Sequence, residues 1–171
     1  MNYLQEKELK AGMRSEMNYP DCPDPDSLES GNSFQDMVAD VLFDKLHIII
    51  QYITSKNGQY NTGESIQGIE IKLDRRCTET GRLSIEIAEK SRASLPSWTP
   101  SGIYRNDNSW LYIQGNNKTI WIFCHTILRL LHKSGKYAPD SVAYGTIKKY
   151  YLPISDADKY AAIKIEMESR G

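Results

Sequence analysis

Apolar residues recur at helical spacing in one long segment and alternate with polar residues in several shorter ones. Over residues 33–46 the apolar side chains fall at intervals of three and four, which predicts an amphipathic helix with one buried face. Ser33 stands just before the first of them and is expected to cap the helix. The predicted buried face consists of Phe34, Met37, Val38, Val41 and Leu42.

Alternation of apolar and polar residues predicts β-strands in the middle of the chain. The two clearest are IEIKLD at residues 69–74 and LSIEIAEK at residues 83–90, which we expect to pair antiparallel. A β-branched run at residues 48–54 predicts another strand, followed by a turn that carries an Asn-Gly pair. Further expected elements are a hairpin over 109–124, a helix over 125–135 and a helix over 155–169 capped by Ser155.

The order of these elements predicts one α+β domain over residues 31–171, with a mixed central β-sheet flanked by helices. A chain of 171 residues, 40% of them hydrophobic, is long enough to bury a substantial core. Residues 1–30 differ, because a polar start is followed by YPDCPDPDSLESGN, whose Pro, Asp and Ser residues are typical of turns. We therefore expect residues 1–30 to form an arm or a linker.

Composition and charge exclude some classes of protein but do not identify the function. The formal net charge is -1, whereas nucleic-acid-binding domains are often strongly basic, so any such contact needs a local basic patch. The three cysteines form no CxxC pair, which indicates neither a disulfide framework nor a cysteine zinc site. The longest apolar runs are too short to cross a bilayer and the start lacks a signal-peptide core, so we expect a soluble cytoplasmic protein without membrane contact.

Candidate chemistry lies in the strand predicted at residues 69–74. Side chains alternate between the two faces of a strand, so Glu70, Lys72 and Asp74 share one face and the apolar residues share the other. Either that polar face is solvated or it holds a metal ion. Carboxylate oxygens are suitable ligands for Mg²⁺, and an ammonium group beside them can stabilise a charged transition state or orient a water molecule.

The sequence GIEIKLD, followed by TGRLSIEIAEKS, resembles the core of the PD-(D/E)XK nuclease superfamily. The resemblance is to small phage and bacterial members with a restriction-endonuclease-like core, and it spans residues 33–125. It implies an endonuclease that uses Mg²⁺ or Mn²⁺ to hydrolyse phosphodiester bonds of DNA rather than RNA. The alternative is the same fold without catalysis, binding nucleic acid or a protein partner. A homodimer is expected only because paired subunits often cut both strands of duplex DNA.

Carried onto this chain, the resemblance makes Glu70 a metal ligand and gives Lys72 a role at the phosphate and the attacking water. The second acid of the site is expected upstream, where the candidate is Glu64. It is a glutamate where the family usually has an aspartate, and only five residues separate it from Glu70. The accessory acid of the preceding helix is expected at Asp36, with Gln35 and Asp40 as alternatives.

A competing assignment pairs Asp74 with Glu86, and Lys90 then supplies the cation. Asp74 lies about 13 Å from Glu70 along an extended strand, too far for both to ligate one ion directly, so the two schemes compete. We favour Glu64 with Glu70. A separation of more than about 8 Å between the carboxylates of Glu64 and Glu70 would reverse that choice, because one hydrated Mg²⁺ could not bridge them.

The residues expected to contact nucleic acid are basic and lie beside aromatic residues. Two follow the 69–74 strand directly, and the others lie in or next to the long loop 91–109, which also holds Trp98 and Tyr104. They are Arg75, Arg76, Lys90, Arg92 and Arg105. The three histidines have no ligand spacing with cysteines or acids, which favours packing or solvent contact over a metal site.

Overall fold

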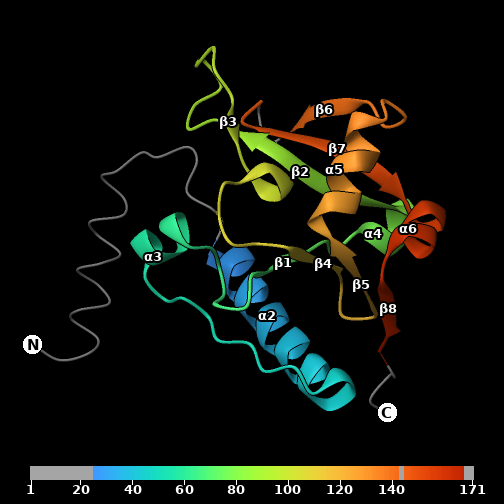
Figure 1. Ribbon diagram of the computed structural model, residues 1–171. Helices are drawn as coiled ribbons and strands as arrows, with labels where there is room; N and C mark the ends of the chain where they lie inside the picture. Colours follow the sequence, from blue (N-terminus) through green and yellow to red (C-terminus); the bar gives the residue numbers. More distant parts are fainter. Residues whose placement is uncertain (1–24, 143–144, 168–171) are drawn as a thin grey trace, which may run out of the picture. The chain divides into compact units, whose positions relative to one another are not determined.

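The computed structural model describes residues 25–142 and 145–167 (Figure 1). The chain forms two compact units, Met1–Ser30 and Gly31–Gly171, and both β-sheets lie in the second. Most of the predicted arm falls outside the described residues. Within the described residues, no helix is both long and apolar enough to cross a membrane.

Helices and strands alternate irregularly along the chain. The helical elements are α2 (Pro25–Leu46), α3 (Lys56–Asn61), α4 (Cys77–Thr80), η1 (Gly102–Tyr104, a 3-10 helix), α5 (His125–Lys133) and α6 (Ile154–Tyr160). The strands are β1 (Ile69–Leu73), β2 (Arg82–Glu89), β3 (Thr99–Pro100), β4 (Leu111–Gly115), β5 (Thr119–Cys124), β6 (Pro139–Val142), β7 (Ile147–Pro153) and β8 (Ile163–Glu166).

The strands form two four-stranded sheets. One has the order β1-β4-β5-β8 and is mixed, because β1 runs parallel to β4 while the other pairs are antiparallel. The other has the order β3-β2-β7-β6 and is antiparallel throughout. The predicted α+β class, with a mixed sheet and flanking helices, is confirmed, and β4 with β5 forms the hairpin expected over residues 109–124.

One face of the mixed sheet packs against α2. The predicted apolar face of the helix is confirmed, because Phe34, Val38 and Leu42 are almost fully buried and pack with the isoleucines of β1. Burying each such side chain contributes about 1.5–3 kcal/mol relative to leaving it exposed. Ile69 and Ile71 therefore anchor β1 through one face and leave its other face to Glu70 and Lys72.

The other face of the mixed sheet packs against the second sheet (Figure 1). This core includes Leu83, Ile85, Tyr112, Trp121, Phe123, Tyr150 and Leu152. Strand register places Glu70 beside Tyr112, and Tyr112 beside Phe123, so the three side chains share this face. Since β1 is an edge strand of its sheet, Glu70 lies at the border of the core between the sheets.

The predicted pairing of the strands at 69–74 and 83–90 is wrong. β1 pairs with β4, whereas β2 pairs with β3 and β7 in the other sheet. The connection between them folds as α4, and Gly81 ends that helix in the left-handed conformation with a φ of 68°. The chain therefore leaves the first sheet through a helical turn instead of reversing in a hairpin.

The helix predicted to begin at Ser33 begins at Pro25, so part of the expected arm is helical. Proline suits the first position of a helix, because its fixed φ is helical and its missing N–H needs no partner there. Residues 48–54 do not form the predicted strand and, within the described part of the chain, make an isolated bridge between Tyr52 and Ser65. The Asn-Gly segment after them is α3, which Ser55 caps by accepting a hydrogen bond from Gly58 N–H.

The predicted C-terminal helix is shorter than expected. It starts at Ile154 without a side-chain cap, ends at Tyr160, and is followed by β8. Asp158, which follows Ser155 by three residues and would complete a capping box with it, instead accepts a hydrogen bond of 2.7 Å from Trp121 Nε1. A long-range contact with a buried indole thus replaces the local one that the sequence suggested.

Candidate functional site

A tight turn at residues 65–68 returns the chain from Glu64 to β1. Ser65 Oγ accepts a hydrogen bond from Ile69 N–H at 2.8 Å and donates one to Ile69 O at 3.0 Å. Gly68 closes the turn with a φ of 70°, a conformation that costs other residues about 1–2 kcal/mol. A Cβ atom at Gly68 would lie 2.4 Å from the carbonyl oxygen of Asn108, so the position also lacks room for a side chain.

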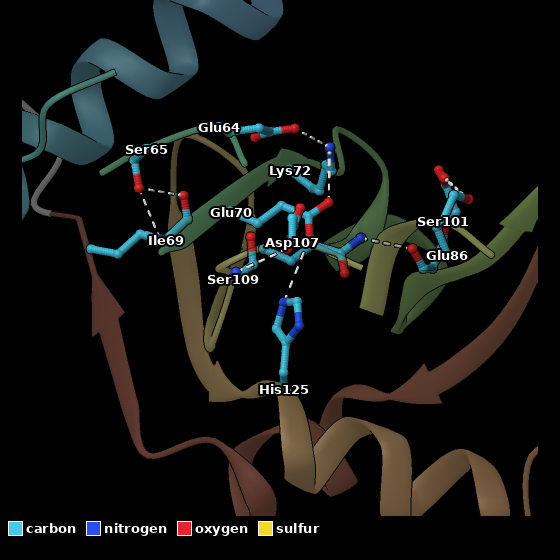
Figure 2. Close-up of polar contacts among 12 residues, drawn as sticks. Glu64, Ser65, Ile69, Glu70, Lys72, Glu86, Ser101, Asp107, Ser109 and His125 are labelled. Atoms are coloured by element: carbon cyan, nitrogen blue, oxygen red, sulfur yellow. Dashed lines mark hydrogen bonds and ion pairs between the residues drawn. The ribbon is translucent and has the colours of Figure 1, made fainter. Parts of the chain in front are cut away.

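The turn places the Glu64 carboxylate beside the polar face of β1. Lys72 Nζ lies 2.7 Å from Glu64 Oε1 and 3.0 Å from Glu70 Oε1 (Figure 2). Because both oxygens contact the same nitrogen, they are close enough for one hydrated ion to bridge. The structure therefore brings together the three residues that the sequence favoured as the catalytic centre.

The polar face of β1 is not simply solvated. The Glu70 residue is 1% exposed, and its carboxylate is stabilised by a charged neighbour rather than by water. Burial acts to raise the pKa of Glu70, but Lys72 and His125 outweigh it and lower that pKa from 4.5 to about 2. Burial acts in the opposite direction on Lys72, yet Glu70 and Glu64 raise the pKa of its ammonium group. Glu70 and Lys72 are therefore both charged at neutral pH.

His125 is a site residue that the sequence reasoning missed. It is 2% exposed, and its Nε2 lies 3.5 Å from Glu70 Oε2 on the side away from Lys72 (Figure 2). Its backbone N–H donates to Trp110 O, which ties the start of α5 to the loop before β4. A signal was present, because His125 directly follows a strand and continues the alternation of Trp121 and Phe123 toward the core between the sheets.

Several buried polar atoms around Glu70 lack a hydrogen-bond partner. They are Glu64 Oε2, Glu70 Oε2, both ring nitrogens of His125, Asp107 Oδ2 and Ser109 Oγ. The loop that carries Asp107 and Ser109 is held against the site by two backbone hydrogen bonds, from Asn108 N–H to Thr62 O and from Trp110 N–H to Gly68 O. Unpaired buried polar atoms are rare and costly, so their concentration here indicates a place for a polar ligand, an ion or water.

The acids of the competing scheme are engaged elsewhere. Asp74 Oδ2 accepts hydrogen bonds from Ser84 N–H at 3.0 Å and from Gln114 Nε2 at 3.3 Å. Glu86 Oε1 accepts one from the Ser101 hydroxyl. The Lys90 ammonium, expected to serve that pair, instead donates to Leu95 O in the neighbouring loop at 2.7 Å. These contacts stabilise the connections around β2 and build no second carboxylate cluster.

The predicted accessory acid, Asp36, is exposed on α2. Its negative charge acts on Tyr52, which lies in the segment before Glu64. The Tyr52 hydroxyl donates a hydrogen bond to Gln35 O at 2.9 Å. Burial raises the pKa of Tyr52 to about 12, and the negative charges of Asp36 and Glu64 add to that effect. The charges of Asp36 and Glu64 therefore act on the same phenol from different elements.

The basic residues expected at nucleic acid follow three different elements. Arg75 and Arg76 are exposed just after β1, where Arg76 also pairs with Glu79 at 3.2 Å. Lys90 and Arg92 lie after β2, and Arg105 follows η1. Among the ion pairs of the described residues, none joins Arg76, Arg92 or Arg105 to the acids of the candidate site.

No family model, curated protein or solved structure matches the chain. Within the residues that the structure describes, no group of three or more His, Cys, Asp or Glu side chains is arranged to hold a metal ion. The function must therefore be inferred from the Glu64, Glu70, Lys72 and His125 cluster itself.

Proposed function

We propose that the chain is a Mg²⁺-dependent nuclease that hydrolyses phosphodiester bonds of DNA, with Glu64, Glu70 and Lys72 as its catalytic residues. The observation that carries the proposal is the Lys72 ammonium group held between two carboxylates at 2.7 and 3.0 Å. Two acids and one lysine converge from a turn and a strand on the border of a buried core.

The residues fit a magnesium ion through the carboxylate oxygens that do not contact Lys72. Glu64 Oε2 and Glu70 Oε2 are buried and have no hydrogen-bond partner in the described structure. Mg²⁺ prefers oxygen ligands and is commonly held by one or two carboxylates, with water and substrate phosphate completing its coordination. A pair of acids is therefore sufficient, and Mn²⁺ would be accepted by the same ligands.

Lys72 and Glu70 would have different roles in the reaction. Lys72 is a third exposed, so its ammonium group can contact a phosphate oxygen and stabilise the negative charge that develops there. Glu70 is held on one side by Lys72 and on the other by His125, which fixes the orientation of its carboxylate. A bound divalent cation would supply charge neutralisation at the phosphate and activation of the attacking water.

The support comes from the side-chain cluster and the motif, and less from the order of the strands. The alternation of apolar and polar residues predicted β1 and β2, which carry the resemblance to PD-(D/E)XK nucleases, in one antiparallel pair, but they belong to different sheets. The acid-x-Lys strand is nevertheless an edge strand, and the Lys72 side chain on its polar face is a third exposed.

One observation favours the alternative function. Lys72 already neutralises both carboxylates, as it would in an ion-pair cluster that only stabilises the fold. The alternative is a nuclease-like protein without catalysis that binds nucleic acid or a protein partner.

Cleavage of labelled linear duplex, branched and single-stranded DNA, with an RNA for comparison, separates the two functions. We expect cleavage that requires Mg²⁺ or Mn²⁺ and falls by about 100-fold or more in Glu70→Gln and in Lys72→Ala. Glu86→Gln is the matched control, because it changes the same residue type in the other sheet. No cleavage of any substrate by the wild type, or equal rates for Glu70→Gln and the wild type, would contradict the proposal.

A further inference from the structure

Trp110 is an exposed indole at the edge of the candidate site. It is 57% exposed, whereas Trp121 is buried and the Trp98 ring already has two ammonium groups near it, from Lys90 at 4.4 Å and Lys148 at 4.9 Å. Ile66, in the turn after Glu64, is 55% exposed. An exposed aromatic and an exposed aliphatic side chain thus occur in the two segments that frame the site.

The indole is fixed rather than free to rotate. Its Nε1 donates a hydrogen bond of 2.8 Å to Gln67 O, and its backbone N–H donates to Gly68 O at 2.9 Å. Its backbone carbonyl accepts from the N–H of His125. A Cβ atom at Gly68 would lie 2.8 Å from Trp110 Cδ1, so the ring packs directly on that glycine. A ring held in one orientation loses little conformational entropy when a ligand stacks on it.

The backbone of Trp110 also lies near the segment that carries Glu70. Trp110 N–H donates a hydrogen bond to Gly68 O, and Gly68 precedes Glu70 by two residues, which span about 7 Å of extended chain. Nucleotides in a stacked strand repeat at about 3.4 Å, so a strand with its phosphate at Lys72 would have a base within reach of the indole.

We infer that Trp110, with Ile66 beside its anchoring carbonyl, is a stacking platform for an unpaired base of a nucleic-acid strand. The inference rests on the proposed function, because it takes a phosphodiester strand as the ligand of the neighbouring acids and lysine. Stacking requires a base that is not already paired within a duplex, so the platform selects single-stranded or frayed nucleic acid over a blunt duplex.

Binding measured by fluorescence anisotropy tests the platform directly. The probes are a labelled oligothymidylate and a labelled blunt hairpin duplex whose strands are joined by a non-nucleotide linker, titrated with the full chain in the absence of divalent cations so that no cleavage interferes. Base–aromatic stacking contributes about 1–3 kcal/mol per base, so Trp110→Ala is expected to weaken single-strand binding by about tenfold. Trp110→Phe should retain most of the affinity, and the hairpin should bind all variants equally.

Leu130→Ala is the matched control, because Leu130 is 58% exposed on α5 and belongs to neither site segment. Equal affinities for Trp110→Ala and Leu130→Ala, no single-strand binding by the wild type, or equal weakening of the hairpin would overturn the inference. Loss of a dimer in Trp110→Ala, seen by sedimentation with oligonucleotide binding unchanged, would also overturn it, since the surface would then contact protein.

The same variants distinguish a failure of this inference from a failure of the nuclease proposal. Single-strand binding that depends on Trp110, in a wild type that cleaves nothing, would support the platform and defeat the proposed hydrolysis. Cation-dependent cleavage with no effect of Trp110→Ala on single-strand binding would support the proposed hydrolysis and defeat the platform.

Discussion

Strands β1 and β2 contain the same tripeptide, Ile-Glu-Ile, yet they hold its glutamate in different environments. Glu70 of β1 is fully buried between an ammonium group and an imidazole. Glu86 of β2 is only partly buried and accepts a hydrogen bond from the Ser101 hydroxyl. The same three residues therefore place a glutamate in an ionic cluster in one sheet and in a hydrogen bond with a loop serine in the other.

The difference arises from what surrounds each strand. In β1 a lysine follows the glutamate by two residues on the same face, whereas Ala88 takes that place in β2. The Gly68 turn then adds Glu64, and the start of α5 adds His125. Local alternation sets which face a carboxylate occupies, but distant segments determine whether it becomes part of a charged site.

The largest effect is expected from the turn that precedes β1. Gly68→Ala forces a side chain into the left-handed region and onto the Asn108 carbonyl, so the free energy of unfolding should fall by about 4 kcal/mol. Gly81, which precedes β2, also has a positive φ, but a Cβ there meets nothing within 4 Å. Gly81→Ala should therefore cost only about 1 kcal/mol. Urea unfolding of both variants measures the two free energies. Equal decreases in the free energy of unfolding would show that the turn at Gly68 is not constrained by its contact with Asn108.

The acid dependence of stability should come to a large extent from Glu70. The pKa of Glu70 is about 2 in the folded chain and near its ordinary value of 4.5 in the unfolded chain. A depressed folded pKa stabilises the fold above the unfolded pKa, and this stabilisation is lost as the pH falls from about 5 to about 2, by about 3 kcal/mol. Glu70→Gln should flatten the pH profile of urea unfolding over that range. An unchanged slope would mean that the carboxylate gains no net stabilisation from Lys72 and His125.

A smaller effect is expected when the cation of the cluster is removed. Lys72→Met leaves Glu64 and Glu70 side by side without a neutralising charge. Breaking a fully buried pair costs about 3–5 kcal/mol, and because Lys72 is a third exposed we expect about 2 kcal/mol. Lys90→Met, after β2, removes a hydrogen bond to a loop carbonyl and a cation–π contact with Trp98, and should cost about 1 kcal/mol. Thermal unfolding compares the two variants. Similar losses of stability would show that Lys72 stabilises the fold no more than Lys90 does.

Much of the first sheet could be predicted because its signals are local. The apolar faces of α2 and β1, the β4–β5 hairpin and the convergence of Glu70 with Lys72 follow from residue spacing alone. Glu64 could be proposed as the acid upstream of that strand, and the turn at Gly68 brings it there. Each of these inferences needs only the geometry of one helix, strand or turn.

The remaining features depend on contacts between distant segments. Two strands with the same alternation joined different sheets, since nothing in LSIEIAEK shows that β7 will be its partner. Residues 163–166 were read as helix because the apolar partner that makes them a strand, Ile120 of β5, lies far away in the chain. His125 was missed because its acid partner, Glu70, is brought to it only by the parallel pairing of β1 with β4.

The central claim is that the carboxylates of Glu64 and Glu70 bind a divalent cation and those around β2 do not. Calorimetric titration of Mn²⁺ into the wild type, Glu70→Gln and Glu86→Gln tests it most directly. We predict a single binding event in the wild type that is retained in Glu86→Gln and weakened at least about tenfold in Glu70→Gln, because among the acids of the two schemes two carboxylates converge on one point only in the cluster of Glu64 and Glu70, whereas Asp74 and Glu86 accept hydrogen bonds from different partners. Mn²⁺ binding that is unchanged by Glu70→Gln, or that is lost in Glu86→Gln instead, would contradict the account.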